Sequence, residues 1–123
     1  MTELTVEKCG EIISHCAGEG TIGFTLRDDY NYWTDVVLNY ASVFELYAAI
    51  GKMADAETDL TFLTLCDIEN VSGDEDFLEL VGHGEFAILR ITTQSYVDTK
   101  ELSLKVSLPA LLGYIEAAVY ECE

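Results

Sequence analysis

Residues 101–122, ELSLKVSLPALLGYIEAAVYEC, change their hydrophobic period halfway along. Up to Leu108, apolar and polar residues alternate, which is the pattern of a strand with one solvent-facing side. Pro109 can then begin a helix, because the first helical residue makes no amide hydrogen bond within the helix. Beyond it, the apolar residues follow helical spacing along one stripe: Leu111, Leu112, Ile115, Ala118, Val119 and Cys122. The chain is therefore predicted to end in a strand that leads directly into a helix.

Several upstream segments also have strand patterns. We predict strands over residues 21–26, 32–40, 60–66, 77–81 and 86–93. Residues 60–66 have apolar groups on both faces, which is typical of a central strand.

A second helix is predicted between two of these strands. Ser42 and Glu45 have the spacing of a capping box, in which the serine oxygen accepts an early amide and the glutamate reaches back. The residues that follow line one helical face: Val43, Leu46, Tyr47, Ile50 and Met53.

The first segment has two interpretations. Val6, Cys9, Ile13 and Cys16 have helical spacing, and Gly18 could end a helix over residues 5–17. A hairpin that turns at Cys9 and Gly10 is the alternative. With the helix, we expect one α+β domain over residues 1–123, with about three helices on a mostly antiparallel sheet in the order αββαββββα. No internal repeat is visible in the sequence.

Negative charge is the strongest feature of the composition. The chain has 23 Asp and Glu residues against 6 Lys and Arg, a formal net charge of −17. A small domain needs a net charge of only about 2 to 8 in magnitude for solubility. Half of the residues are hydrophobic, so the acidity does not indicate disorder. Such a field repels nucleic acid phosphates and anionic lipid, and we expect a basic protein as the partner.

The N-terminus and the cysteines favour the cytosol. The chain begins without the basic residues of a secretory signal, and no apolar run reaches the roughly 18 residues of a membrane span. Cys9, Cys16, Cys66 and Cys122 form no CxxC pair, and we expect them to be reduced and packed in the core. Their spacing matches no zinc site, so no metal is expected.

One candidate binding surface is a run of acids. Ten carboxylates and no Lys or Arg occur between Met53 and Leu89. Within this span an acidic loop is predicted to face a partner, although a solvated loop would have the same composition. Its candidate partner-binding residues are Asp67, Glu69, Asp74, Glu75, Asp76 and Glu79. The loop fails the EF-hand pattern, because taking Gly73 as the sixth position makes Ile68 the first ligand.

A second candidate surface combines acids with aromatic rings in residues 28–35. Its predicted contacts are Asp28, Asp29, Tyr30, Tyr32 and Asp35. Tyrosines give large contact areas with few torsions to freeze, and aspartates beside them can pair with Lys or Arg. For Trp33 a core position is favoured, since single tryptophans are usually mostly buried, and a place in the interface is the alternative.

Catalysis has little support in the sequence. His15 and His83 are the only side chains that titrate near neutrality without a large shift, and no nucleophile, metal or phosphate-loop motif surrounds them. We therefore predict no enzyme activity, no catalytic residues and no cofactor.

In size, acidity and the two acidic segments over residues 28–35 and 67–79, the chain resembles the small immunity proteins that bacteria make against toxic nucleases. The resemblance implies a cytosolic protein that binds a basic toxin and occludes its active site. One alternative is a phage-type mimic of nucleic acid that blocks DNA-binding proteins. Another is a small metal-dependent enzyme, which would require His83 and nearby carboxylates to form a pocket.

Overall fold

The computed structural model describes residues 2–6, 10–18, 20–28, 30, 32–65, 76–94 and 99–122, with only the backbone for 2–6. Two helices and eight strands lie within these residues: β1 (Thr2–Val6), β2 (Gly10–Gly18), β3 (Thr21–Asp28), β4 (Trp33–Asn39), α1 (Tyr40–Ala54), β5 (Leu60–Leu65), β6 (Asp76–His83), β7 (Phe86–Gln94), β8 (Thr99–Ser107) and α2 (Leu108–Cys122). The α+β class is confirmed. The expected order αββαββββα and the third helix are wrong, because the first segment forms strands.

That first segment adopts the hairpin alternative, with β1 antiparallel to β2. Ile12 and Ser14 of β2 are buried and Ile13 between them is only half-buried, so side chains alternate in the first part of the strand. Ser14 conceals this period, because a polar residue at a buried position breaks the apolar alternation in the sequence. The helical spacing of Ile13 and Cys16 therefore misled the prediction.

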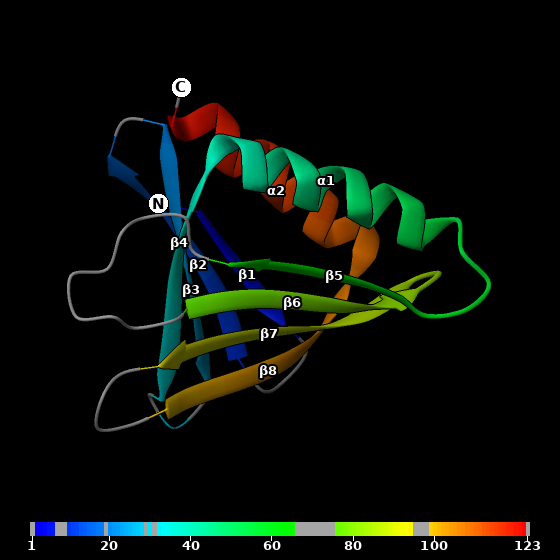
Figure 1. The fold of residues 1–123 in the computed structure, drawn as a ribbon, viewed down its shortest axis with the longest axis horizontal. Coiled ribbons are helices and arrows are strands. Elements are labelled where there is room, and N and C mark those ends of the chain that lie inside the picture. Colours follow the sequence, from blue (N-terminus) through cyan, green and yellow to red (C-terminus); the bar gives the residue numbers. More distant parts are fainter. Residues whose placement is uncertain are drawn as a thin grey trace.

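The strands form two four-stranded antiparallel sheets instead of one, in the orders β1-β2-β3-β4 and β5-β6-β7-β8. The strands of one sheet cross those of the other at a steep angle (Figure 1). Both helices lie above the β5–β8 sheet in this view. Side chains from both sheets and both helices form one core, of which the largest fully buried members are Ile12, Ile22, Leu26, Leu38, Leu46, Ile50, Met53, Leu78, Leu80, Ile91, Leu108 and Leu111.

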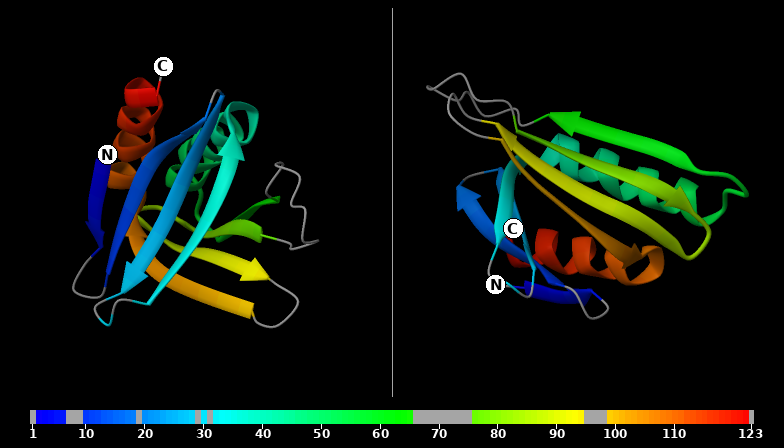
Figure 2. Two further views of the ribbon diagram at one scale, coloured as in Figure 1. Left: turned by 90° about the vertical axis from the view of Figure 1, so that its left-hand side faces the viewer. Right: turned by 90° about the horizontal axis from the view of Figure 1, so that it is seen from below.

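The order of elements repeats, with four strands and a helix in residues 2–54 (the first half) and again in residues 60–122 (the second half). Each helix contacts both sheets. Helix α2 lies mainly against β1 and β2 of the other half, whereas α1 lies against β3 and β4 of its own half as well as β5 and β6 of the other (Figure 2). Because both helices contact both sheets, the two halves share one core.

Hairpin tips fix both ends of the helices. The first amide of each helix donates to the tip of its own half, from Tyr40 to the Gly20 carbonyl at 3.0 Å and from Leu108 to the Glu85 carbonyl at 2.7 Å. The last turn of α1 is held by the second half, where the Gly84 amide donates to the Met53 carbonyl at 2.9 Å. Gly20 and Gly84 have φ angles of 73° and 66°, which favour glycine.

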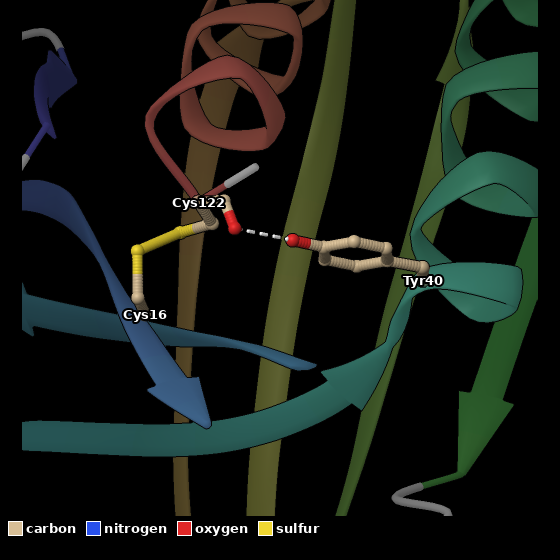
Figure 3. The surroundings of a disulfide bond; sticks show 3 residues. All are labelled: Cys16, Tyr40 and Cys122. Atoms are coloured by element: carbon tan, nitrogen blue, oxygen red, sulfur yellow. Dashed lines mark hydrogen bonds between the residues drawn. A yellow bond between two sulfur atoms is a disulfide. The ribbon is translucent and has the colours of Figure 1, made fainter. Parts of the chain in front are cut away.

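The last turn of α2 is held by a disulfide between Cys16 of β2 and Cys122, whose Cα atoms are 5.4 Å apart (Figure 3). The Tyr40 hydroxyl also donates to the Cys122 carbonyl at 2.7 Å. The expectation that Cys16 and Cys122 are reduced is therefore wrong, although Cys122 does pack against the core as a partly buried residue. Cys16 is exposed at the end of β2, where the hairpin tip brings it to the helix. The predictions for Cys9 and Cys66 fall outside the described residues.

Helix α1 begins earlier than its capping-box pattern predicts. Asn39 is the N-cap, and its Oδ1 accepts the Ser42 amide at 2.8 Å. Ser42 itself is buried inside the first turn. Asn39 can cap because it ends β4 with extended backbone, which is the usual conformation of an N-cap.

Strand β5 lies at an edge of its sheet, so the central position expected from its apolar residues is wrong. Leu63 and Leu65 are 54% and 58% exposed on its outer face. The apolar residues on both faces of β5 are therefore not explained by burial within the sheet.

Candidate protein-binding surface

Between β3 and β4, Asp28 holds the backbone at two of the described residues, Tyr30 and Tyr32. Its Oδ1 accepts the Tyr30 amide at 2.8 Å and the Tyr32 amide at 3.0 Å. The Asp28 amide donates to the Tyr32 carbonyl at 2.9 Å. Aspartate commonly closes turns in this way. The carboxylate that was predicted to contact a partner therefore positions the turn.

Three aromatic rings project from this region into solvent. Tyr30 is 91% exposed, Trp33 is 52% exposed and Tyr32 is 39% exposed. The expectation that Trp33 belongs to the core is wrong. Thr34 and Val36 face inward on β4, so Trp33 and Asp35 face outward. The alternation of Val36 and Leu38 was the sequence signal for this exposure, and it was outweighed by the usual burial of tryptophan.

The aromatic turn, which we define as the described residues 28, 30 and 32–35, lies where the first sheet meets the second. The Lys100 ammonium of β8 lies 5.1 Å from the centroid of the Trp33 ring, within the range of a cation–π contact. The Thr93 hydroxyl of β7 donates to the Asp35 carbonyl at 3.0 Å. Residues of the second half, Lys100 and Thr93, thus contact Trp33 and Asp35 of the aromatic turn.

Most of the predicted acidic loop falls outside the described residues: Asp67, Glu69, Asp74 and Glu75, with Asp29 from the other segment. Asp76 and Glu79 lie on β6. Asp76 Oδ1 accepts the Gln94 amide at 3.3 Å, and Glu79 forms an ion pair with Arg90 at 2.8 Å. These two carboxylates therefore make contacts within the second sheet.

Several cations are engaged by acids or rings. Arg27 pairs with Glu11, and Arg90 lies 3.7 Å from Glu101 in addition to its pair with Glu79. The Lys105 ammonium lies 4.5 Å from the centroid of Phe86. With 6 Lys and Arg for 23 carboxylates, such pairing leaves a large negative surplus.

The two helices enclose a cleft of about 290 Å³ that the sequence analysis missed, lined by Phe44, Tyr47, Ile115, Glu116, Val119 and Tyr120. The Tyr47 hydroxyl donates to Glu116 Oε1 at 2.5 Å. This hydrogen bond is the main reason that the pKa of Tyr47 is raised, and desolvation and the nearby Glu116 charge add to it. Phe44 was the available signal, because it lies outside the predicted buried stripe of α1.

A larger groove of about 450 Å³ separates α1 from β5, and its lining residues are Glu45, Ala48, Ala49, Lys52, Met53, Leu60, Thr61 and Phe62. It lies on a different face of α1 from the cleft. The two hollows thus leave both sides of α1 open to a ligand or a partner.

The histidines lie in different settings. His83 Nδ1 is 2.6 Å from Asp59 Oδ1, and both side chains are about half exposed. His15 is exposed on β2. Within the part of the chain that the structure describes, no three His, Cys, Asp or Glu side chains form a group that could hold a metal ion. The arrangement of the described surface is suited to binding through rings, apolar groups and carboxylates.

Among the described residues, neither helix is long and apolar enough to cross a membrane. No protein-family model matches the chain, and no curated protein or solved structure matches it either.

Proposed function

We propose that the protein binds and neutralises a basic protein, in the manner of the small acidic immunity proteins that occlude the active site of a toxic nuclease. The observation that carries the proposal is the aromatic turn, where Tyr30, Tyr32 and Trp33 are exposed on a backbone held by Asp28. This aromatic surface belongs to a chain of net charge −17.

The hydrogen bonds from the Tyr30 and Tyr32 amides to Asp28 restrict the backbone beside the rings, and tyrosine and tryptophan side chains have few torsions to freeze. Both features reduce the entropy lost when a partner docks. Exposed Asp35 lies on the same strand face as Trp33 and can pair with a lysine or arginine whose stem packs on the ring. Tyr30 and Trp33 would then supply the desolvated centre of the interface.

The net charge supports fast association with a cationic partner. Long-range attraction raises the encounter rate, and dissolved salt screens it over about 8 Å at physiological ionic strength. We therefore expect association to slow as salt rises, while dissociation depends mainly on the aromatic contacts.

We further propose that the protein acts in the cytosol of the producing cell, without catalytic activity. The disulfide between Cys16 and Cys122 opposes the first point, because such bonds are rare in reducing compartments. Alkylation inside intact cells tests it. Labelling of both cysteines would fit a cytosolic location, whereas protection of both would favour an oxidising compartment.

Capture from the native lysate at low salt, followed by a salt wash, tests the proposed function. The wild-type protein should retain one basic protein, Trp33→Ala should lose it, and Tyr120→Ala should keep it. Tyr120 is the matched control, because it is an aromatic residue 81% exposed on α2. Equal retention by Trp33→Ala and the wild type would contradict the proposal.

The same capture distinguishes a mimic of nucleic acid. A mimic should retain several DNA-binding proteins at once, and their retention should be insensitive to Trp33→Ala because the carboxylates alone would imitate phosphates. An inhibitor of one toxin should retain a single species.

A further inference from the structure

We infer that the groove between α1 and β5 binds an extended segment of the basic partner, which adds a strand to the second sheet. The inference rests on the proposed function for the charge of the partner. Its structural basis is separate, because the groove and the aromatic turn have no residue in common.

The unpaired edge of β5 is the first observation. Among the described residues, β5 pairs with β6 alone and forms one border of its sheet (Figure 2). Its sequence, LTFLTL, has no charge, proline or glycine. Edge strands usually carry such residues to prevent pairing with another chain. Strand β8, at the opposite edge, has Lys100, Glu101 and Lys105.

The shape of the groove is the second observation. A strand added to β5 would lie about 4.8 Å from it and direct alternate side chains to opposite faces. Those on the inner face would enter the groove of about 450 Å³ between β5 and α1. Ala48 and Ala49 leave space on the helix side, and half-buried Phe62 gives an apolar surface on the strand side.

Charge identifies the occupant. Glu45 lines the groove, and exposed Asp55, Glu57 and Asp59 precede β5, whereas Lys52 is the cation in the lining. A second copy of this chain would bring its own net charge of −17 to this edge. The groove therefore fits a segment of alternating apolar or β-branched residues with lysine or arginine near its ends, as in peptide recognition by strand addition.

Selection of random dodecamers displayed on phage tests the inference with purified protein. Selected peptides should show that pattern, and Ala49→Phe should weaken their binding at least about tenfold by filling the groove. Ala117→Phe should leave binding unchanged, because Ala117 is exposed on α2 and lines neither the groove nor the cleft. If Ala49→Phe unfolds, Ala48→Phe at an exposed position replaces it. Selected peptides that bind the groove variant as tightly as they bind the wild type would overturn the inference.

The strongest dodecamer then tests backbone pairing. Its binding should slow hydrogen exchange at β5 amides. Two versions of the peptide, N-methylated on the odd or on the even residues, should differ, and one of them should bind at least about tenfold more weakly, since only one alternate set of amides can donate to β5. Unchanged exchange in β5, or equal binding after methylation, would exclude strand addition.

These results are independent of the proposed function. Loss of the Trp33 effect in the capture experiment would remove the neutralisation proposal while peptide selection still reported on the groove. Failure to obtain any peptide that the groove variant rejects would remove the inference alone.

Discussion

The two halves of the molecule have the same order of four strands and a helix, but different bonds hold the ends of their helices. In each half, a hairpin tip accepts the first amide of its own helix, from Tyr40 or from Leu108. The last turn of α1 is then held to the opposite tip by one backbone hydrogen bond at Met53, whereas the last turn of α2 is held by a disulfide at Cys122. The last turn of one helix is therefore held by a hydrogen bond, and the equivalent turn of the other helix is held by a covalent bond.

The halves also differ in the surfaces that they expose. The first half contributes the aromatic turn, and the second contributes the uncharged edge of β5. The strands and helices repeated in both halves therefore form the shared core. The aromatic turn and the edge of β5 lie outside this core and are available for binding.

Removal of the disulfide should have the largest effect on stability. Cys122→Ser should lower the free energy of unfolding by about 2 to 4 kcal/mol, because the bond joins residues 106 positions apart and restricts the unfolded chain. Urea denaturation measures the change. The double variant Cys16→Ser with Cys122→Ser should match the single one. A loss below about 0.5 kcal/mol would mean that hydrogen bonds suffice at both junctions.

Glycine substitution at the hairpin tips should have a smaller and equal effect in the two halves. Gly20→Ala and Gly84→Ala should each cost about 1 kcal/mol, since both residues have positive φ and an added Cβ meets nothing within 4 Å. Gly51→Ala is the control and should stabilise the protein by about 0.5 to 1 kcal/mol, because Gly51 lies inside α1. Thermal denaturation of the three variants gives the comparison, and unequal costs at the tips would show that the halves are not mechanically equivalent.

Titration of Tyr47 should give the smallest effect. Its phenol loses its proton above the usual pKa of about 10, because the hydrogen bond to Glu116 favours the neutral form. The raised pKa means that this contribution to stability is complete below the unfolded-state pKa and is lost as pH rises through the folded-state pKa.

Ultraviolet titration with Tyr47→Phe as the reference isolates this group. Glu116→Gln should move the pKa of Tyr47 downward, because it removes the charge of the acceptor. An unchanged pKa in Glu116→Gln would show that the contact between α1 and α2 is not maintained in solution.

Local alternation was enough to predict most strands and both helices. Hydrophobic period predicted strands over residues 21–26 and 86–93 and a final helix beginning at Pro109, close to the observed β3, β7 and α2, where most buried positions carry apolar side chains. It failed at β2 because Ser14 is buried there, so the inward-facing residues are not uniformly apolar. At the aromatic turn, the predicted exposure of Tyr30 and Asp35 is observed, whereas Trp33 was assigned to the core and is exposed. That these residues contact a partner stays a prediction.

Long-range features could not be obtained from local pattern. The bond between Cys16 and Cys122 depends on a hairpin tip meeting a helix end from the other half. The edge position of β5 depends on strand order, which its own residues do not encode. Helix α1 likewise begins at Tyr40 because the preceding strand supplies Asn39 as its cap, whereas the predicted box began at Ser42.

The most direct test of the central claim is the equilibrium dissociation constant of the captured basic protein for the wild type, Trp33→Ala and Tyr120→Ala. If the aromatic turn is the centre of the interface, Trp33→Ala should weaken binding about 30-fold, the effect of losing a hot-spot residue worth about 2 kcal/mol. Tyr120→Ala should bind as the wild type does. Equal dissociation constants for the wild type and Trp33→Ala would contradict the account, and a loss confined to Tyr120→Ala would move the interface to the cleft between the helices.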